Sequence, residues 1–192
     1  MTPVESVQRE RALGLWLFLM GDVVLFALLF GTYAVMVPAT DGGPVPGPAL
    51  FSLGRTAIYS ALLLLSAPTF GMASVALARG ARGAAMLWLV VTFGLGAAFL
   101  ALELAEFRAL VAQDAGPGRS GFLSAYFALV GTHGLHVAAG LVWLGVTMAR
   151  LIAGTSAVAL GPSVELLGAF WHLIGLVWVV IYSVVYLPAL AT

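Results

Sequence analysis

The chain has 192 residues, of which 62% are hydrophobic and 8% are charged, with eight basic and eight acidic side chains. Soluble domains carry about 25% charged residues, so this composition indicates an integral membrane protein, and the balanced charge excludes a nucleic-acid-binding surface. The lack of cysteine excludes disulfides, thiolate catalysis, iron–sulfur clusters and haem attachment through a Cys-x-x-Cys-His motif.

Five segments are long and apolar enough to cross a bilayer, which takes roughly 20 residues. The expected helices cover residues 12–37, 56–78, 84–111, 122–152 and 166–190. The connectors are short and rich in Gly, Pro and Ser, and the polar N-terminus runs straight into the first apolar segment, unlike a cleaved signal peptide. The sequence therefore predicts an all-α membrane protein, a single domain over residues 1–192, built as a bundle of five transmembrane helices.

The first expected helix contains a carboxyl group, Asp22, in the run LFLMGDVVLF. It lies about ten residues into the helix, roughly 15 Å deep at helical rise. Two interpretations stay open, because an ionisable group at that depth needs a reason to be there. Asp22 either fixes packing, as a neutral carboxyl or through a hydrogen bond to a neighbouring helix, or it handles protons or faces lipid.

The third expected helix carries two carboxyl groups, Glu103 and Glu106, three residues apart and therefore on one face. Arg108 lies close by in the sequence and moderates their charge. A helical carboxylate metal site would need a Glu-x-x-His motif on a facing helix, and the sequence has none. A structural role for the two glutamates is therefore favoured.

The fourth expected helix has two histidines, His133 and His136, near its middle and on one face. Buried polar groups need hydrogen-bond partners. Counting helical rise from Ser120 places His133 roughly one turn deeper than Glu103. We therefore expect each imidazole to pair with Glu103 or Glu106 across the interface between the third and fourth helices.

The fifth expected helix contributes His172, in GAFWHLIGLVW. A small membrane cytochrome with a haem between His136 and His172 is one alternative, although three histidines cannot supply two haem pairs. A proton-coupled carrier using Asp22, Glu103 and the histidines is another. Serine-protease, zinc-protease, P-loop and dinucleotide motifs do not occur, so we predict no catalytic residue and no metal ligand.

Arginine placement predicts the orientation of the bundle, because cytoplasmic loops are enriched in positive charge. Five arginines fall on one side and three on the other, and the first side is expected to be cytoplasmic. The first group is Arg9, Arg11, Arg79, Arg82 and Arg150, and the second is Arg55, Arg108 and Arg119. The N-terminus is therefore expected in the cytoplasm and the C-terminus in the periplasm.

Small residues predict close helix packing in the third and fourth helices. They are Gly94, Gly96, Ala97, Ala98, Gly131, Gly134, Ala138 and Gly140.

Four stretches together carry a family resemblance. They are MGD in the first helix, ELAEF in the third, GTHGLHVAAGLVW in the fourth and FWHLIGLVWVVIYSVVYL in the fifth. In this order they resemble subunit III of the haem–copper oxidases, for which a Gly-x-His-Gly-x-His-Val run is a specific marker. The resemblance extends over residues 14–187. Five helices with a short polar N-terminus are similar to the ubiquinol oxidase branch (cytochrome o, bo-type), with the five-helix subunits of cytochrome c oxidases and nitric oxide reductases as the runner-up.

The resemblance implies an accessory subunit of a proton-pumping terminal oxidase in a bacterial inner membrane. Such a complex oxidises ubiquinol and reduces oxygen to water. Haems, copper and the quinone site are then expected in the large subunit I, with subunits II and IV and phospholipids as further partners. This chain is expected to hold no cofactor and to support stability, lipid binding and proton uptake.

The resemblance also implies roles for individual residues. Asp22 matches a carboxyl that reacts with carbodiimides and faces a lipid-filled cleft in seven-helix relatives. Arg150 matches a position where some relatives hold a lipid phosphate. Gly175 stands where the family usually has an aspartate, so a hydrogen bond expected from that carboxylate is missing or replaced. The family's polar-core positions correspond to Glu106, His133, His136 and His172.

Overall fold

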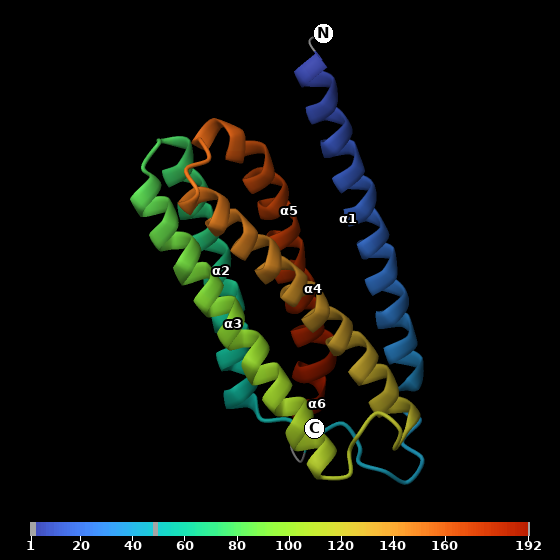
Figure 1. Cartoon of the computed structure of the whole chain (residues 1–192). Coiled ribbons are helices and arrows are strands. Elements are labelled where there is room, and N and C mark those ends of the chain that lie inside the picture. The colour runs from blue at the N-terminus through green and yellow to red at the C-terminus, as the bar shows by residue number, and fades with distance from the viewer. Residues whose placement is uncertain (1–2, 48–49, 192) are drawn as a thin grey trace.

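A computed structural model of the chain describes residues 3–47 and 50–191. Within these residues five helices are long and apolar enough to span a membrane, which confirms the predicted architecture (Figure 1). They are α1 (Pro3–Met36), α2 (Leu53–Ala78), α3 (Arg82–Ala112), α4 (Gly121–Ile152) and α5 (Ala157–Ile181). The last helix continues through a short π-helical segment, η1 (Tyr182–Tyr186), into α6 (Leu187–Ala191).

The helix bounds match the prediction to within about three residues for α2, α3 and α4, but not at the starts of α1 and α5. Helix α1 begins at Pro3, although the apolar run begins near residue 12. Helix α5 begins at Ala157 instead of near residue 166, in a stretch that we expected to be a loop. Ser156 explains this difference, because its hydroxyl accepts the Ala159 N–H at 3.3 Å and caps the helix.

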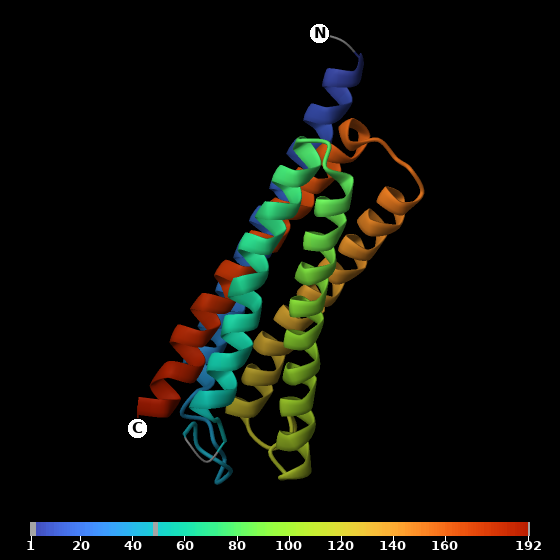
Figure 2. The same cartoon turned by 90° about the vertical axis from the view of Figure 1, so that its left-hand side faces the viewer.

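The N-terminus, the α2–α3 turn and the α4–α5 connector share one end of the bundle, here called the N-terminal end (Figures 1 and 2). The other two connectors and the C-terminus lie at the opposite end. Arg79, Arg82 and Arg150 therefore lie at the N-terminal end, as predicted from the sequence. Two glycines with positive φ, Gly80 and Gly154, follow α2 and α4 there and allow the chain to leave each helix.

The helices differ in how completely their neighbours surround them. Helices α2 and α3 run side by side (Figure 2), α5 contacts both α2 and α4, and α4 also contacts α3. Helix α1 stands at the edge and packs mainly against α4, with a smaller contact to α5 (Figure 1). Large apolar side chains such as Trp16 and Leu28 are exposed on α1. This surface suits hydrocarbon or the helix of a partner protein.

Two tryptophans of α5 tie that helix to α2. The Trp171 indole N–H donates to the Ser66 hydroxyl at 3.0 Å, and the Trp178 indole N–H donates to the Ser60 hydroxyl at 3.0 Å. All four side chains are buried, so each bond satisfies an indole donor that has no water to bind.

Three of the small residues that predict close packing do allow it. A Cβ at Gly96 or Gly140 would lie 2.9 or 2.8 Å from the Trp171 ring, so these glycines of α3 and α4 make room for the indole. A Cβ at Gly134 would lie 2.8 Å from Glu103 Oε1. Gly94, in contrast, faces open space.

Candidate functional site: buried polar groups on α1, α3 and α4

An aspartate and a histidine meet near the middle of the membrane-spanning helices. His136 Nε2 of α4 lies 3.4 Å from Asp22 Oδ1 of α1, and the Asp22 residue is buried. His136 Nδ1 lies 2.7 Å from the Thr132 carbonyl oxygen, which can only accept, so Nδ1 carries a hydrogen. An attractive contact between Nε2 and Oδ1 therefore needs one further proton, either on Nε2 or on Asp22. The contact therefore links α1 to α4 through two ionisable side chains.

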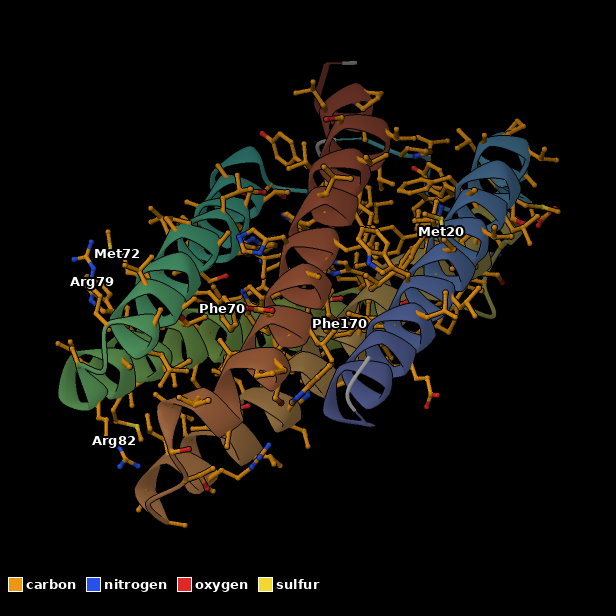
Figure 3. The ribbon with its side chains drawn as sticks, turned by 90° about the horizontal axis from the view of Figure 1, so that it is seen from above. Met20, Phe70, Met72, Arg79, Arg82 and Phe170 are labelled. Atoms are coloured by element: carbon orange, nitrogen blue, oxygen red, sulfur yellow. The ribbon has the colours of Figure 1, made fainter. Side chains whose placement is uncertain are left out.

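Aromatic rings enclose this pair. Phe26 of α1 meets His136 edge-on with ring centroids 5.2 Å apart, and Phe170 of α5 lies 6.3 Å from the same imidazole. Figure 3 shows Phe170 in the space between α5 and α1. Asp22 Oδ2 is buried and has no hydrogen-bond partner among residues 3–47 and 50–191. The rings therefore keep the pair in apolar surroundings, where its interaction is stronger than in water.

His133 makes a different contact from its neighbour. Its Nε2 lies 3.2 Å from the Ile174 carbonyl oxygen of α5, so Nε2 donates and Nδ1 is left as an acceptor. Nδ1 has no partner in the described part of the chain. Phe99 and Trp178 pack around the ring, with centroids 5.6 and 5.1 Å away. His133 thus joins α4 to α5 through a fully buried imidazole.

The two glutamates of α3 also differ from each other. Neither oxygen of Glu103 has a hydrogen-bond partner within the described residues, and the carboxyl end lies in the notch left by Gly134. Glu106 lies within interaction range of the Tyr59 hydroxyl of α2, and Arg55 contributes a favourable charge interaction. Glu106 therefore joins α3 to α2, whereas Glu103 is packed without a polar contact.

The predicted imidazole–carboxylate bonds from Glu103 or Glu106 are wrong. The carboxylate partner of His136 is Asp22, and His133 pairs with a backbone carbonyl. The physical reason is that α4 has α3 on one side and α1 on another, and His136 faces α1. Helical spacing gives the face of a helix that a residue occupies, but not the neighbour that the face meets.

His172 is also placed differently from the expectation, which counted it among the buried polar groups. Its side chain is exposed on α5, with Nδ1 2.6 Å from the Gly168 carbonyl and the ring edge-on to Phe70. His136 already directs Nε2 at Asp22, so its contacts favour a hydrogen-bonded pair over a haem ligand shared with His172.

Other groups complete the picture of the site. Arg150 is exposed in the last turn of α4. In the described ranges, His, Asp and Glu side chains form no group of three or more that could hold a metal ion. The sequence analysis did not single out three buried tyrosines. Tyr59 interacts with Glu106, and the Tyr126 and Tyr186 hydroxyls lie 2.9 Å apart. A tyrosine inside an apolar segment could have indicated them, because a buried hydroxyl needs a hydrogen-bond partner.

Comparison with known proteins decides the family. The family model described as cytochrome c oxidase subunit III matches residues 3–189. The chain belongs to this subunit III family. The match covers nearly the whole chain, and it confirms the resemblance drawn from the histidine and tryptophan motifs of α4 and α5.

Individual members of the subunit III family are similar along most of their length. The chain is 47% identical over 174 residues to the cytochrome bo(3) ubiquinol oxidase subunit 3 of Pseudomonas aeruginosa, covering 91% of this chain and 83% of that protein. It is 46% identical over 175 residues to the subunit of the same name from Pseudomonas putida, covering 91% and 84%. The cytochrome c oxidase subunit 3 of Bacillus sp. strain PS3 is 39% identical over 179 residues, covering 93% and 86%.

Proposed function

We propose that this subunit III is a non-catalytic accessory subunit of a proton-pumping ubiquinol oxidase in a bacterial inner membrane. The observation that carries the proposal is the higher identity to the two Pseudomonas ubiquinol oxidase subunits than to the Bacillus cytochrome c oxidase subunit. The complex oxidises ubiquinol and reduces oxygen to water. Its haems, copper and quinone site belong to the large subunit I, and this chain contributes no redox centre.

The five helices act in this complex as one membrane domain with the N-terminus in the cytoplasm. The cluster of arginines at the N-terminal end supports this orientation. Subunits I, II and IV are the protein partners. The exposed apolar face of α1 is a suitable contact for a membrane helix of a partner or for lipid.

The polar residues of the bundle divide into two roles. Glu106 and His133 hold helices together through Tyr59 and the Ile174 carbonyl. Asp22 and His136 form a pair that can hold one proton and release it when the contact opens, which supports a role in sustained proton supply to the large subunit. Arg150 lies where it can bind a lipid phosphate at the membrane surface.

A cytochrome c oxidase is the second candidate. The Bacillus relative is named as a subunit of that oxidase, and the match covers 86% of its length. Both candidates place this chain in an oxidase complex, and they differ in the electron donor. A proton-coupled carrier would instead act alone.

The experiment is purification of the native complex through a tag on this chain. We expect haem-bearing partners to co-purify, the visible spectrum to come from those partners, and ubiquinol but not reduced cytochrome c to support oxygen consumption. Turnover with cytochrome c would assign the second candidate. Recovery of the chain without haem-bearing partners, together with solute flux in liposomes, would contradict both and favour a carrier.

A further inference from the structure

An open groove runs between α2 and α3 on the outer surface of the bundle, close to the N-terminal end. Its volume is about 560 Å³, within the range of roughly 300–1,000 Å³ that small-molecule sites occupy. Figure 2 shows the face that α2 and α3 form together. The side chains that matter for its chemistry are Gly71, Met72, Val75, Arg79, Ala84 and Trp88.

Small side chains create the groove, and larger ones form its walls. Gly71 has no side chain, and a Cβ placed there would meet nothing within 4 Å. Ala84 faces it from the first turns of α3. Met72 and Val75 supply apolar walls and are about half exposed, at 49% and 50%. An apolar and narrow guest therefore fits between the two helices.

A cation without a partner closes the groove at the membrane surface. Arg79 follows directly after the apolar span Gly54–Ala78, and its side chain makes no hydrogen bond or ion pair with any other described residue. Figure 3 shows Arg79 and Met72 projecting from the same outer side of α2, away from α5 and α1. None of the residues that line the groove is acidic. Arg79 is therefore free to bind an external anion.

Arg82 shows what a structural arginine looks like at the same turn. Its guanidinium donates to the carbonyl oxygens of Leu151 and Thr155 at 3.1 and 2.9 Å and so closes the C-terminal end of α4. Arg79 lacks such a role, although it is only three residues away.

A second polar donor lies deeper in the groove. Trp88 stands six residues after Arg82, which is about 9 Å further along α3 at helical rise. Its indole N–H has no acceptor within the described part of the chain, whereas the buried indoles of Trp171 and Trp178 both have one. Trp88 is partly buried, and a tryptophan of this kind is typical of the membrane interface, where the ring packs on hydrocarbon and the N–H meets a polar group.

We propose that this groove binds one anionic phospholipid, with its phosphate on Arg79 and one acyl chain lying along Gly71, Met72 and Val75. The Trp88 indole N–H is then placed to donate to an ester carbonyl of the same lipid. The polarity of the groove matches that of a phospholipid. The charged Arg79 lies at the headgroup level, the Trp88 indole lies deeper, and the apolar channel continues beyond them. A partner helix would have to bring an acid to Arg79 to bury it. The proposal deepens, and rests on, the proposed lipid-binding role, and gives it a location separate from Arg150.

The test uses the intact oxidase complex in vesicles that contain phosphatidylglycerol with a photoactivatable group on its acyl chain. After illumination, labelled peptides are mapped by mass spectrometry in the wild-type complex and in three variants. Arg79→Gln removes the charge, Gly71→Leu fills the groove without touching the charge, and Arg150→Gln is the matched control at the same end of the bundle. Each preparation is also assayed for assembly and ubiquinol oxidation.

We expect label on the peptides of α2 and α3 in the wild type. A surface arginine contributes about 1 kcal/mol to binding anionic lipid, so Arg79→Gln should reduce this label about fivefold. Gly71→Leu should reduce it as well, and Arg150→Gln should leave it unchanged. Equal labelling in all four, or an α2–α3 face protected by crosslinks to another subunit, would overturn the lipid site. Failure to assemble or to oxidise ubiquinol in the wild type would instead contradict the proposed function.

Discussion

Asp22 and His136 lie 114 residues apart along the chain, and a 3.4 Å contact between Oδ1 and Nε2 brings them together across the interface of α1 and α4. Helix α1 packs mainly on α4, and this contact joins a polar side chain of each helix. A contact of 3.4 Å is long for a hydrogen bond between a carboxyl and an imidazole. The proposed role in proton supply gives this deep ionisable pair a function that can be tested.

Replacement of Asp22 by Asn tests this explanation. The amide preserves the size of the carboxyl but cannot take up or release a proton, so Asp22→Asn should leave assembly and initial turnover intact. Activity should then fall during prolonged turnover, and the free energy of unfolding should change by less than about 1.5 kcal/mol. The measurement is oxygen consumption over many cycles together with thermal unfolding of the purified complex.

His136→Gln provides the matched variant for the same pair, because it removes the other half of the contact. It should reproduce the loss of activity, and the double variant should be no worse than either single one. Glu165→Gln, which changes an exposed acid of α5, should behave as the wild type. Unchanged turnover in Asp22→Asn over many cycles would leave Asp22 as a packing residue.

The sequence correctly predicts the number of membrane-spanning helices and the burial of four ionisable side chains: Asp22, Glu103, Glu106 and His133. Both can be read from the sequence, because they depend only on the length of an apolar segment and the position of a residue within it. It fails where the answer depends on which helix lies next to which. His136 meets Asp22 because α1 packs against α4, and no residue in either helix specifies that pairing by itself. His172 is exposed because the neighbours of α5 do not cover the face on which it lies.

Gly140 makes room for the Trp171 ring, so Gly140→Ala should destabilise the bundle. The added Cβ would lie 2.8 Å from a ring atom, and the indole cannot move freely because its N–H is bonded to Ser66. Overpacking of this kind costs about 1–3 kcal/mol. Thermal unfolding of the purified complex gives the measurement. Gly145→Ala in the same helix is the control, since its Cβ would meet nothing within 4 Å, and equal effects of the two changes would refute the packing argument.

Ser66 is the acceptor for the buried Trp171 indole, and Ser66→Ala removes it. The unpaired N–H should lower the free energy of unfolding by about 1–3 kcal/mol. Ser74→Ala in the same helix should have a smaller effect, within about 0.5 kcal/mol, because Ser74 bonds only to the Phe70 carbonyl of its own helix. A denaturation midpoint for each variant separates the two, and a harmless Ser66→Ala would mean that the indole finds another acceptor.

Replacing the two glutamates of α3 should have opposite effects on the free energy of unfolding. Glu106→Met should lower the free energy of unfolding by about 1–3 kcal/mol, because it leaves the Tyr59 hydroxyl without its partner. Glu103→Met should leave stability unchanged or raise it, because neither oxygen of Glu103 has a partner in the described structure and an apolar side chain of similar length removes a buried polar group.

Glu106→Gln supplies the control for this comparison, because an amide oxygen still accepts from the Tyr59 hydroxyl and should retain most of the stability. Thermal inactivation of the intact complex measures all three variants under one set of conditions. A larger loss for Glu103→Met than for Glu106→Met would contradict this argument and show that the Glu103 carboxyl has a polar partner. Because its oxygens are buried inside the bundle, that partner would be an internal water.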